Sequence, residues 1–204
     1  MKIKLHEKDL PNNLNFKNSI AIDTETMGLN PIRDRLCLVQ ISKGDNVCHL
    51  VKLNSIKDRP KNLIKILKDK KIQKIFHYAR FDVAFLKYKF KINIENIYCT
   101  KIASKLSRSY TDQHGYKDLC KEILGVEINK SSQSSDWGNF ILSKDQLKYA
   151  ATDVLYLHKI KKELDKMLLR EGRHRIAKAC FEFIKYKTDL DLLGWNDNND
   201  IFKH

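Results

Sequence analysis

The stretch SIAIDTETMGLNPIRDRLCLVQIS, residues 19–42, decides the predicted fold. It contains two short runs, SIAID at 19–23 and LCLVQIS at 36–42, whose aliphatic and β-branched residues predict buried strands. The segment between them contains Gly28, Asn30 and Pro31, which indicate a turn. A third run, NVCHLVKL at 46–53, extends the pattern. We therefore expect an antiparallel meander of three strands before the first long helix.

Helical and strand patterns alternate after this meander. Helices are expected at 60–69, 80–90, 100–107, 116–124, 143–170 and 177–187, and further strands at 74–77 and 96–100. Ser143 followed by Gln146 is a capping box, which predicts where the long helix begins. Gly125 occupies the position that commonly follows a helix end. The order predicts an α/β fold with a mixed five-stranded sheet flanked by helices.

Composition narrows the class of protein. The 204 residues are 42% hydrophobic, with 7 Gly and 3 Pro, so we expect a single domain over residues 1–204 rather than a fibrous or low-complexity chain. No apolar stretch approaches the length of a membrane span, and residues 1–13 contain no signal-peptide core. We expect a soluble, cytoplasmic protein without membrane contact. The five cysteines contain no C-x-x-C pair and predict reduced core thiols.

The charge is strongly positive. Lys and Arg number 39 against 25 Asp and Glu, a formal net charge of +14. Such an excess attracts polyanions and favours a nucleic-acid partner. A solvated basic surface without a specific partner explains the same excess equally well.

Asp23 and Glu25 lie at the carboxyl end of the first apolar strand. Alternate residues of a strand share a face, so the two carboxylates can project to one side. Paired carboxylates are ligands that Mg²⁺ or Mn²⁺ prefers. The alternative is two solvated charges at a strand end.

Two further acids stand beside predicted elements. Asp82 lies near the start of the helix at 80–90, where it would either bind a metal or simply stabilise the helix N-terminus. Tyr149 and Asp153 are spaced i and i+4, so they share a helix face next to apolar residues. A metal would relieve the cost of a buried carboxylate there, and a Tyr–Asp hydrogen bond is the alternative.

Taken together, these motifs resemble the Tyr-bearing form of the DEDD exonuclease superfamily, in the order Asp23-x-Glu25, Asp82, and Tyr149-x-x-x-Asp153. The segments HYARFDVAFL, CTKIASKL, KSSQSSDW and YAATDVLYL resemble the ribonuclease D branch. This resemblance implies a ribonuclease H-like (DnaQ-like exonuclease) fold. The catalytic core would span about residues 15–165, with a C-terminal helix and tail at 172–204.

We expect a chain of this length to lack the helical RNA-binding domains of full-length ribonuclease D. Its size and the segments TKIASKLSRSYTDQHG and LDLLGW resemble instead the small stand-alone bacterial enzymes called nanoRNase C. That resemblance implies dinucleotide substrates and a homo-oligomer, with a ring-shaped octamer as one form.

The superfamily resemblance also implies a mechanism. Two divalent cations, Mg²⁺ or Mn²⁺, would be held by Asp23, Glu25, Asp82 and Asp153, and the catalytic residues would be these four acids and Tyr149. Asp23, Glu25 and Asp153 would hold the ion that activates water, and Asp23 would bridge to a second ion near Asp82. Tyr149 would orient the attacking water.

Candidate substrate-binding residues surround these motifs: Thr24, Leu29, His77, Arg108, His114, Gln133, Ser135 and Trp137. Leu29 resembles a residue that wedges between the last two bases of a short oligonucleotide, or it packs as a turn residue. His77 and Trp137 have structural alternatives, as a hydrogen-bonded strand end and a core residue. Arg108 and His114 would serve their own site or a neighbouring subunit's.

The main hypothesis is a metal-dependent 3′–5′ exoribonuclease that hydrolyses short oligoribonucleotides, especially dinucleotides, to 5′-nucleoside monophosphates. One alternative is the same chemistry on longer RNA, such as tRNA 3′ ends, or on DNA. The other is a non-catalytic nucleic-acid-binding module.

Overall fold

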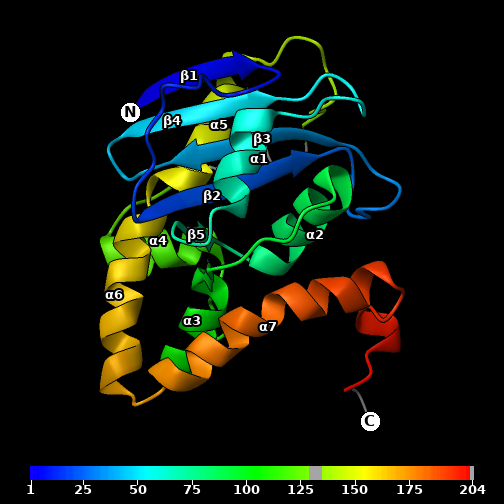
Figure 1. Ribbon diagram of the computed structural model, residues 1–204. Coiled ribbons are helices and arrows are strands. Elements are labelled where there is room, and N and C mark those ends of the chain that lie inside the picture. The colour runs from blue at the N-terminus through cyan, green and yellow to red at the C-terminus, as the bar shows by residue number, and fades with distance from the viewer. Residues whose placement is uncertain (129–134, 203–204) are drawn as a thin grey trace.

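The computed structural model describes residues 1–128 and 135–202 (Figure 1). Its strands are β1 (Lys2–Glu7), β2 (Ser19–Thr26), β3 (Leu36–Ser42), β4 (Val47–Lys52), β5 (Gln73–Phe76) and β6 (Ile97–Cys99). Its helices are α1 (Lys61–Lys68), α2 (Ala79–Phe90), α3 (Thr100–Ser107), α4 (Tyr116–Leu124), α5 (Lys144–Leu155), α6 (Leu157–Arg170) and α7 (His174–Leu192), followed by the 3₁₀-helix η1 (Asp197–Asn199).

One sheet organises these elements, with the strand order β1-β4-β3-β2-β5-β6. β2, β3 and β4 form the predicted antiparallel meander, whereas β1 pairs parallel to β4, and β5 and β6 extend the sheet in parallel beyond β2. All seven residues of β3 are buried because helices cover both faces of the sheet there. The predicted mixed sheet flanked by helices is therefore confirmed.

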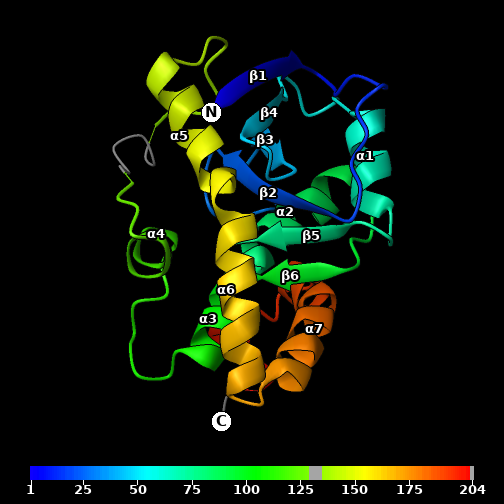
Figure 2. The ribbon, with the colours of Figure 1, turned by 90° about the vertical axis from the view of Figure 1, so that its left-hand side faces the viewer.

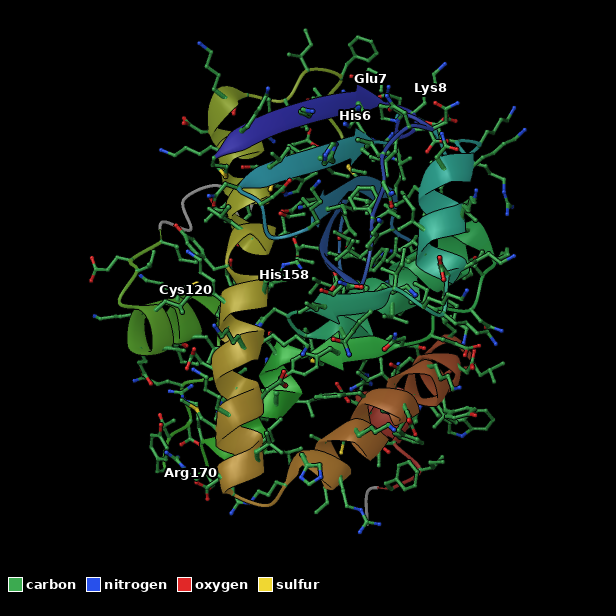
Figure 3. All side chains as sticks on the ribbon, turned by 60° about the vertical axis from the view of Figure 1, so that its left-hand side comes forward. His6, Glu7, Lys8, Cys120, His158 and Arg170 are labelled. Carbon is green, nitrogen blue, oxygen red and sulfur yellow. The ribbon has the colours of Figure 1, made fainter. Side chains whose placement is uncertain are left out.

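The predicted number of strands was wrong: among the described residues the sheet has six strands, because β1 adds an edge. The sequence KIKLHE alternates only two apolar residues, Ile3 and Leu5, with polar ones, and no residue of β1 is fully buried. β1 is held by backbone pairing to β4, by packing of Ile3 against the core and by side-chain contacts of His6 and Glu7. His6, labelled in Figure 3, stacks on His49 with ring centroids 5.1 Å apart.

Helices cover both faces of the sheet. α5 packs across β2, β3 and β4 on one face, and α2 packs against β3 and β5 on the other. Figure 2 shows α5 and α6 as a nearly continuous column along one side of the molecule. α7 crosses beneath α2 in Figure 1 and packs against it.

The helix expected over residues 143–170 is two helices, since α5 ends at Leu155 and α6 begins at Leu157. The Tyr116 hydroxyl enters the helix at this point. It donates to the Thr152 carbonyl at 2.6 Å and accepts from the Tyr156 amide at 3.3 Å, so it stands in the place of one backbone i→i−4 bond. A side chain from α4 therefore divides the helix, which helical periodicity along the chain cannot reveal.

None of the described helices is long and apolar enough to cross a membrane. The five cysteines all lie in the part of the chain that the structure describes, where none forms a disulfide, and four of them are buried. These thiols match the prediction of reduced, mostly core cysteines.

Candidate active site

Strand β2 places two acids on one face near its carboxyl end. Asp23 and Glu25 alternate with Thr24, as the strand period requires. The antiparallel register puts Gln40 of β3 opposite Asp23. The Gln40 amide donates to Asp23 Oδ2 and to Glu25 Oε1, both at 3.2 Å, so this fully buried side chain holds the two carboxylates side by side.

Helix α2 supplies the third acid. Asp82 stands in its first turn and is 2% exposed. Thr24 Oγ1 donates to Asp82 Oδ1 at 2.6 Å, which ties the helix to the strand that carries Asp23 and Glu25. The backbone enters α2 through Tyr78, a non-glycine residue with φ 64° and no side-chain capping bond.

Helix α5 supplies the remaining pair. The predicted capping box is present, because Ser143 Oγ accepts from the Gln146 amide at 3.1 Å and Gln146 Oε1 accepts from the Ser143 amide at 2.9 Å. Tyr149 and Asp153 follow one turn apart, partly buried, beside the buried Ala150, Ala151 and Val154. Ligand atoms of Asp23, Glu25 and Asp153 all lie within 4.8 Å of one another.

Crowded, buried carboxylates resist ionisation. Burial, and then the charges of Asp153 and Asp82, raises the pKa of Glu25 to about 9. Burial raises the pKa of Asp82 to about 7, against the lowering effect of the Thr24 hydrogen bond. The pKa of Asp23 is raised well above its ordinary range by burial and by the three other acids. Burial and the Asp153 charge also raise the Tyr149 pKa, so the phenol stays protonated at neutral pH.

The acids open onto a pocket of about 580 Å³. Its wall includes Asp153 and four aromatic residues, Tyr78, Phe81, Tyr116 and Tyr149. Lys101 of α3 is the one lysine or arginine among the described residues that line it. Its Nζ lies 4.3 Å from the centroid of the Tyr78 ring.

Five predicted substrate-binding residues line this pocket: Thr24, Leu29, His77, Ser135 and Trp137. Leu29 is 82% exposed at the rim and Trp137 is 4% exposed, with its ring centroid 6.1 Å from that of Tyr149. His77 Nδ1 lies 2.9 Å from Thr100 Oγ1, the kind of bond expected if this ring is held at the strand end. Gln133 lies outside the described residues.

Arg108 and His114 are not brought to the pocket. Arg108 is 1% exposed, and its guanidinium is hydrogen-bonded to Glu122, to Ser104 Oγ and to the Gln113 carbonyl. A ring nitrogen of His114 lies 2.8 Å from Ser104 Oγ. The structure therefore places this pair in a buried network that holds the segment between α3 and α4.

The contributors to the site that were missed from the sequence include Gln40, Lys101 and Tyr116. Gln40 had a usable signal, because it is an amide inside an otherwise apolar strand run. Lys101 and Tyr116 had none, since a lysine and a tyrosine at helix starts are ordinary residues.

The donor set fits divalent metal ions. Hard carboxylate oxygens are the ligands of Mg²⁺ and Mn²⁺, and a bound cation would offset the repulsion among three partly buried acids that approach so closely. Asp23, Glu25 and Asp153 form one ligand group. Asp82 is held next to this group by its hydrogen bond from Thr24, which stands between Asp23 and Glu25.

A mixed sheet whose central strand carries such acids is the arrangement of metal-dependent nucleases with the ribonuclease H-like fold. The chain belongs to the 3′–5′ exonuclease domain family, whose model matches residues 3–169.

Similarity to individual proteins supports this assignment. The chain is 34% identical over 155 residues to ribonuclease D of Gluconacetobacter diazotrophicus, which is 76% of this chain and 39% of that protein. The chain thus spans well under half the length of this relative. The structure of Brucella melitensis NrnC with bound Mg²⁺ is similar over the whole of both chains, with 50% identity and a TM-score of 0.95. NrnC bound to pGG gives 51% identity and a TM-score of 0.96, covering 100% of this chain and 99% of that chain.

Proposed function

We propose that the protein is a metal-dependent 3′–5′ exoribonuclease that hydrolyses short oligoribonucleotides, especially dinucleotides, to 5′-nucleoside monophosphates. The observation that carries the proposal is the partly buried group of Asp23, Glu25 and Asp153 that lines the pocket, with Asp82 beside it. Phosphodiester hydrolysis needs neutralisation of phosphate charge and a nucleophile at neutral pH, and such a site provides both when it is loaded with metal.

Two divalent cations, Mg²⁺ or Mn²⁺, would be held by the four acids. Asp23, Glu25 and Asp153 would hold one ion, and Asp82 would help to hold the other. When bound, the ions would lower the pKa of water and shield the phosphate.

The remaining side chains position these groups. Gln40 fixes the rotamers of Asp23 and Glu25 through its two hydrogen bonds. Thr24 fixes Asp82. The raised pKa of Tyr149 makes its hydroxyl a hydrogen-bond donor and acceptor rather than a base, so it orients the attacking water.

Two observations support a short substrate. A pocket of about 580 Å³ is within the range of small-ligand sites. The similar NrnC structure is described as bound to pGG. The similarity to ribonuclease D favours a second candidate, trimming of longer RNA such as tRNA 3′ ends, or of DNA.

We also propose a homo-oligomer. Aromatic side chains on α7 and the tail are exposed, among them Phe183 (40%), Tyr186 (55%) and Phe202 (62%). Exposed aromatic clusters of this kind are typical of association surfaces. Light scattering of the purified chain gives the assembly mass, and a monomer at all concentrations would contradict this part of the proposal. A cytoplasmic location remains a prediction from the sequence.

The decisive experiment is hydrolysis of a 5′-labelled dinucleotide and of an RNA of about twenty nucleotides, with Mg²⁺ and with Mn²⁺. We expect mononucleotide release with a strong preference for the dinucleotide. Asp153→Asn should abolish it, whereas Asp145→Asn, an exposed acid on the same helix, should retain it. A preference for the longer RNA would favour the ribonuclease D-like candidate. Full activity of Asp153→Asn would contradict the catalytic assignment.

A further inference from the structure

Helix α7 lies beyond the residues matched by the exonuclease family, which end at 169, yet it contacts the helix that carries Asp82. Figure 1 shows α7 running beneath α2, with the tail folded back at its end. We infer that α7 and the tail position Asp82 through an ion pair between Arg80 and Asp191. The inference rests on the proposed function and adds a positioning role for a segment outside the matched domain.

The geometry of this ion pair is specific. Arg80 Nε donates to Asp191 Oδ2 and its second terminal nitrogen donates to Asp191 Oδ1, both at 2.6 Å. The remaining terminal nitrogen donates to Asp197 Oδ1 at 2.6 Å. The Arg80 and Asp191 side chains are only 24% and 12% exposed. A bidentate, shielded pair fixes orientation as well as distance, unlike an exposed lysine contact.

Arg80 stands two residues before Asp82, in the first turn of α2. A cation is unfavourable there because the helix N-terminus carries partial positive charge. Asp191 and Asp197 offset that cost. The turn into α2 also has a left-handed Tyr78 and no side-chain cap, so its own hydrogen bonds hold it weakly. The carboxylates from α7 and the tail therefore stabilise the first turn of α2, which orients the Asp82 side chain.

Asp191 is itself held in place. Lys187 Nζ lies 3.3 Å from Asp191 Oδ1 and 3.2 Å from Asp200 Oδ2, and it donates to the Trp195 carbonyl at 3.2 Å. The tail thus folds around one lysine and closes over the Arg80 contact. Displacing it would release the start of α2, while Asp23, Glu25 and Asp153 sit on other elements.

A second ion pair between the same helices provides a matched control. Lys87 Nζ lies 2.5 Å from Asp189 Oδ1, near the end of α2 and away from Asp82. Asp191→Asn and Asp189→Asn each remove one carboxylate charge from α7. Only the first should change the metal site.

The test measures Mn²⁺ binding to the full chain by electron paramagnetic resonance and titration calorimetry, alongside kcat and KM. Asp191→Asn should weaken the weaker Mn²⁺ site about 10-fold, the low end for loss of a group that orients a metal ligand, and lower kcat more than it raises KM. Asp191→Glu should restore Mn²⁺ affinity, and Asp189→Asn should match the wild type. Arg80→Lys, which loses the bidentate geometry, provides the same test if Asp191→Asn does not fold.

Equal Mn²⁺ affinities in Asp191→Asn and Asp189→Asn would overturn the inference, as would an Asp191→Glu variant as weak as Asp191→Asn. The two proposals fail separately. Dinucleotide hydrolysis with unchanged Mn²⁺ binding in Asp191→Asn refutes the positioning role alone. If Asp191→Asn but not Asp189→Asn weakens Mn²⁺ binding, while the wild-type protein hydrolyses no RNA, the proposed function alone is refuted.

Discussion

Gln40 illustrates how one side chain sets the chemistry of its neighbours. Its amide bridges Asp23 and Glu25 from the next strand, and its Oε1 has no partner among the described residues. The Asp-x-Glu alternation was predictable because it depends only on the strand period. Gln40 stands out as an amide in an apolar run, but its partners were not predictable, because they depend on the register between β2 and β3, which one sequence does not show.

The raised pKa values of Glu25, about 9, and Asp82, about 7, predict how stability depends on pH. A carboxyl whose pKa is higher in the folded chain stabilises the fold while protonated, and this contribution is lost as pH rises through the folded value. The metal-free chain should therefore lose stability between about pH 4 and pH 9. Bound Mg²⁺ or Mn²⁺ offsets the carboxylate charges, so metal should stabilise the protein more at high pH than at low pH.

Thermal unfolding in EDTA and in Mn²⁺, at about pH 5 and about pH 8, measures this effect. Burial lowers the pKa of His49 to about 4, which gives stability the opposite slope below about pH 6.5. His49 lies outside the acid group and should contribute equally with and without metal, so the difference between the two conditions reports the acids. Glu25→Gln should reduce that difference. Equal stabilisation by Mn²⁺ at both pH values would contradict the prediction.

At the scale of elements, prediction succeeded where the signal was local. The meander of β2, β3 and β4 and the helices α3 and α4 follow from periodicity and caps, and Gly125 has the left-handed φ of 66° expected after a helix end. It failed where a distant group intervened. β1 depends on pairing with β4, and the break at Tyr156 depends on the Tyr116 hydroxyl.

The capping box of α5 gives a prediction at this scale. Ser143→Ala removes the acceptor for the Gln146 amide and should lower the free energy of unfolding by about 1 kcal/mol. Fraying would affect the start of α5, whereas Tyr149 and Asp153 lie further along the helix. Ser143→Ala should therefore lower kcat by a smaller factor than it lowers the folding equilibrium constant. Urea unfolding measures the first effect and steady-state kinetics the second. The exposed neighbour Lys144→Ala is the control, and an equal loss of stability in both variants would argue against the cap.

At the scale of the molecule, the net charge of the chain is positive, whereas the pocket is acidic. The chain carries +14 in net charge, yet four acids line the pocket and Lys101 is the only lysine or arginine among its described lining residues. The positive excess therefore lies largely elsewhere on the surface. Net charge predicted a polyanionic partner but not the place where the phosphate is bound, because composition carries no positional information.

This separation predicts how binding depends on salt. Each phosphate contact with a cation contributes about −0.7 to the slope of log affinity against log salt for single strands. If the pocket binds a dinucleotide as proposed, Lys101 is the one lysine or arginine among its described lining residues that could meet the phosphate, so the salt dependence of its KM should be shallow. An RNA of about twenty nucleotides contacts several surface lysines and should show a much steeper slope in fluorescence anisotropy with the inactive Asp153→Asn variant. Lys101→Met should flatten the dinucleotide slope further, whereas Lys65→Met, on the distant helix α1, should leave it unchanged. Equal slopes for the two RNAs would mean that the basic surface, rather than the acidic pocket, selects the substrate.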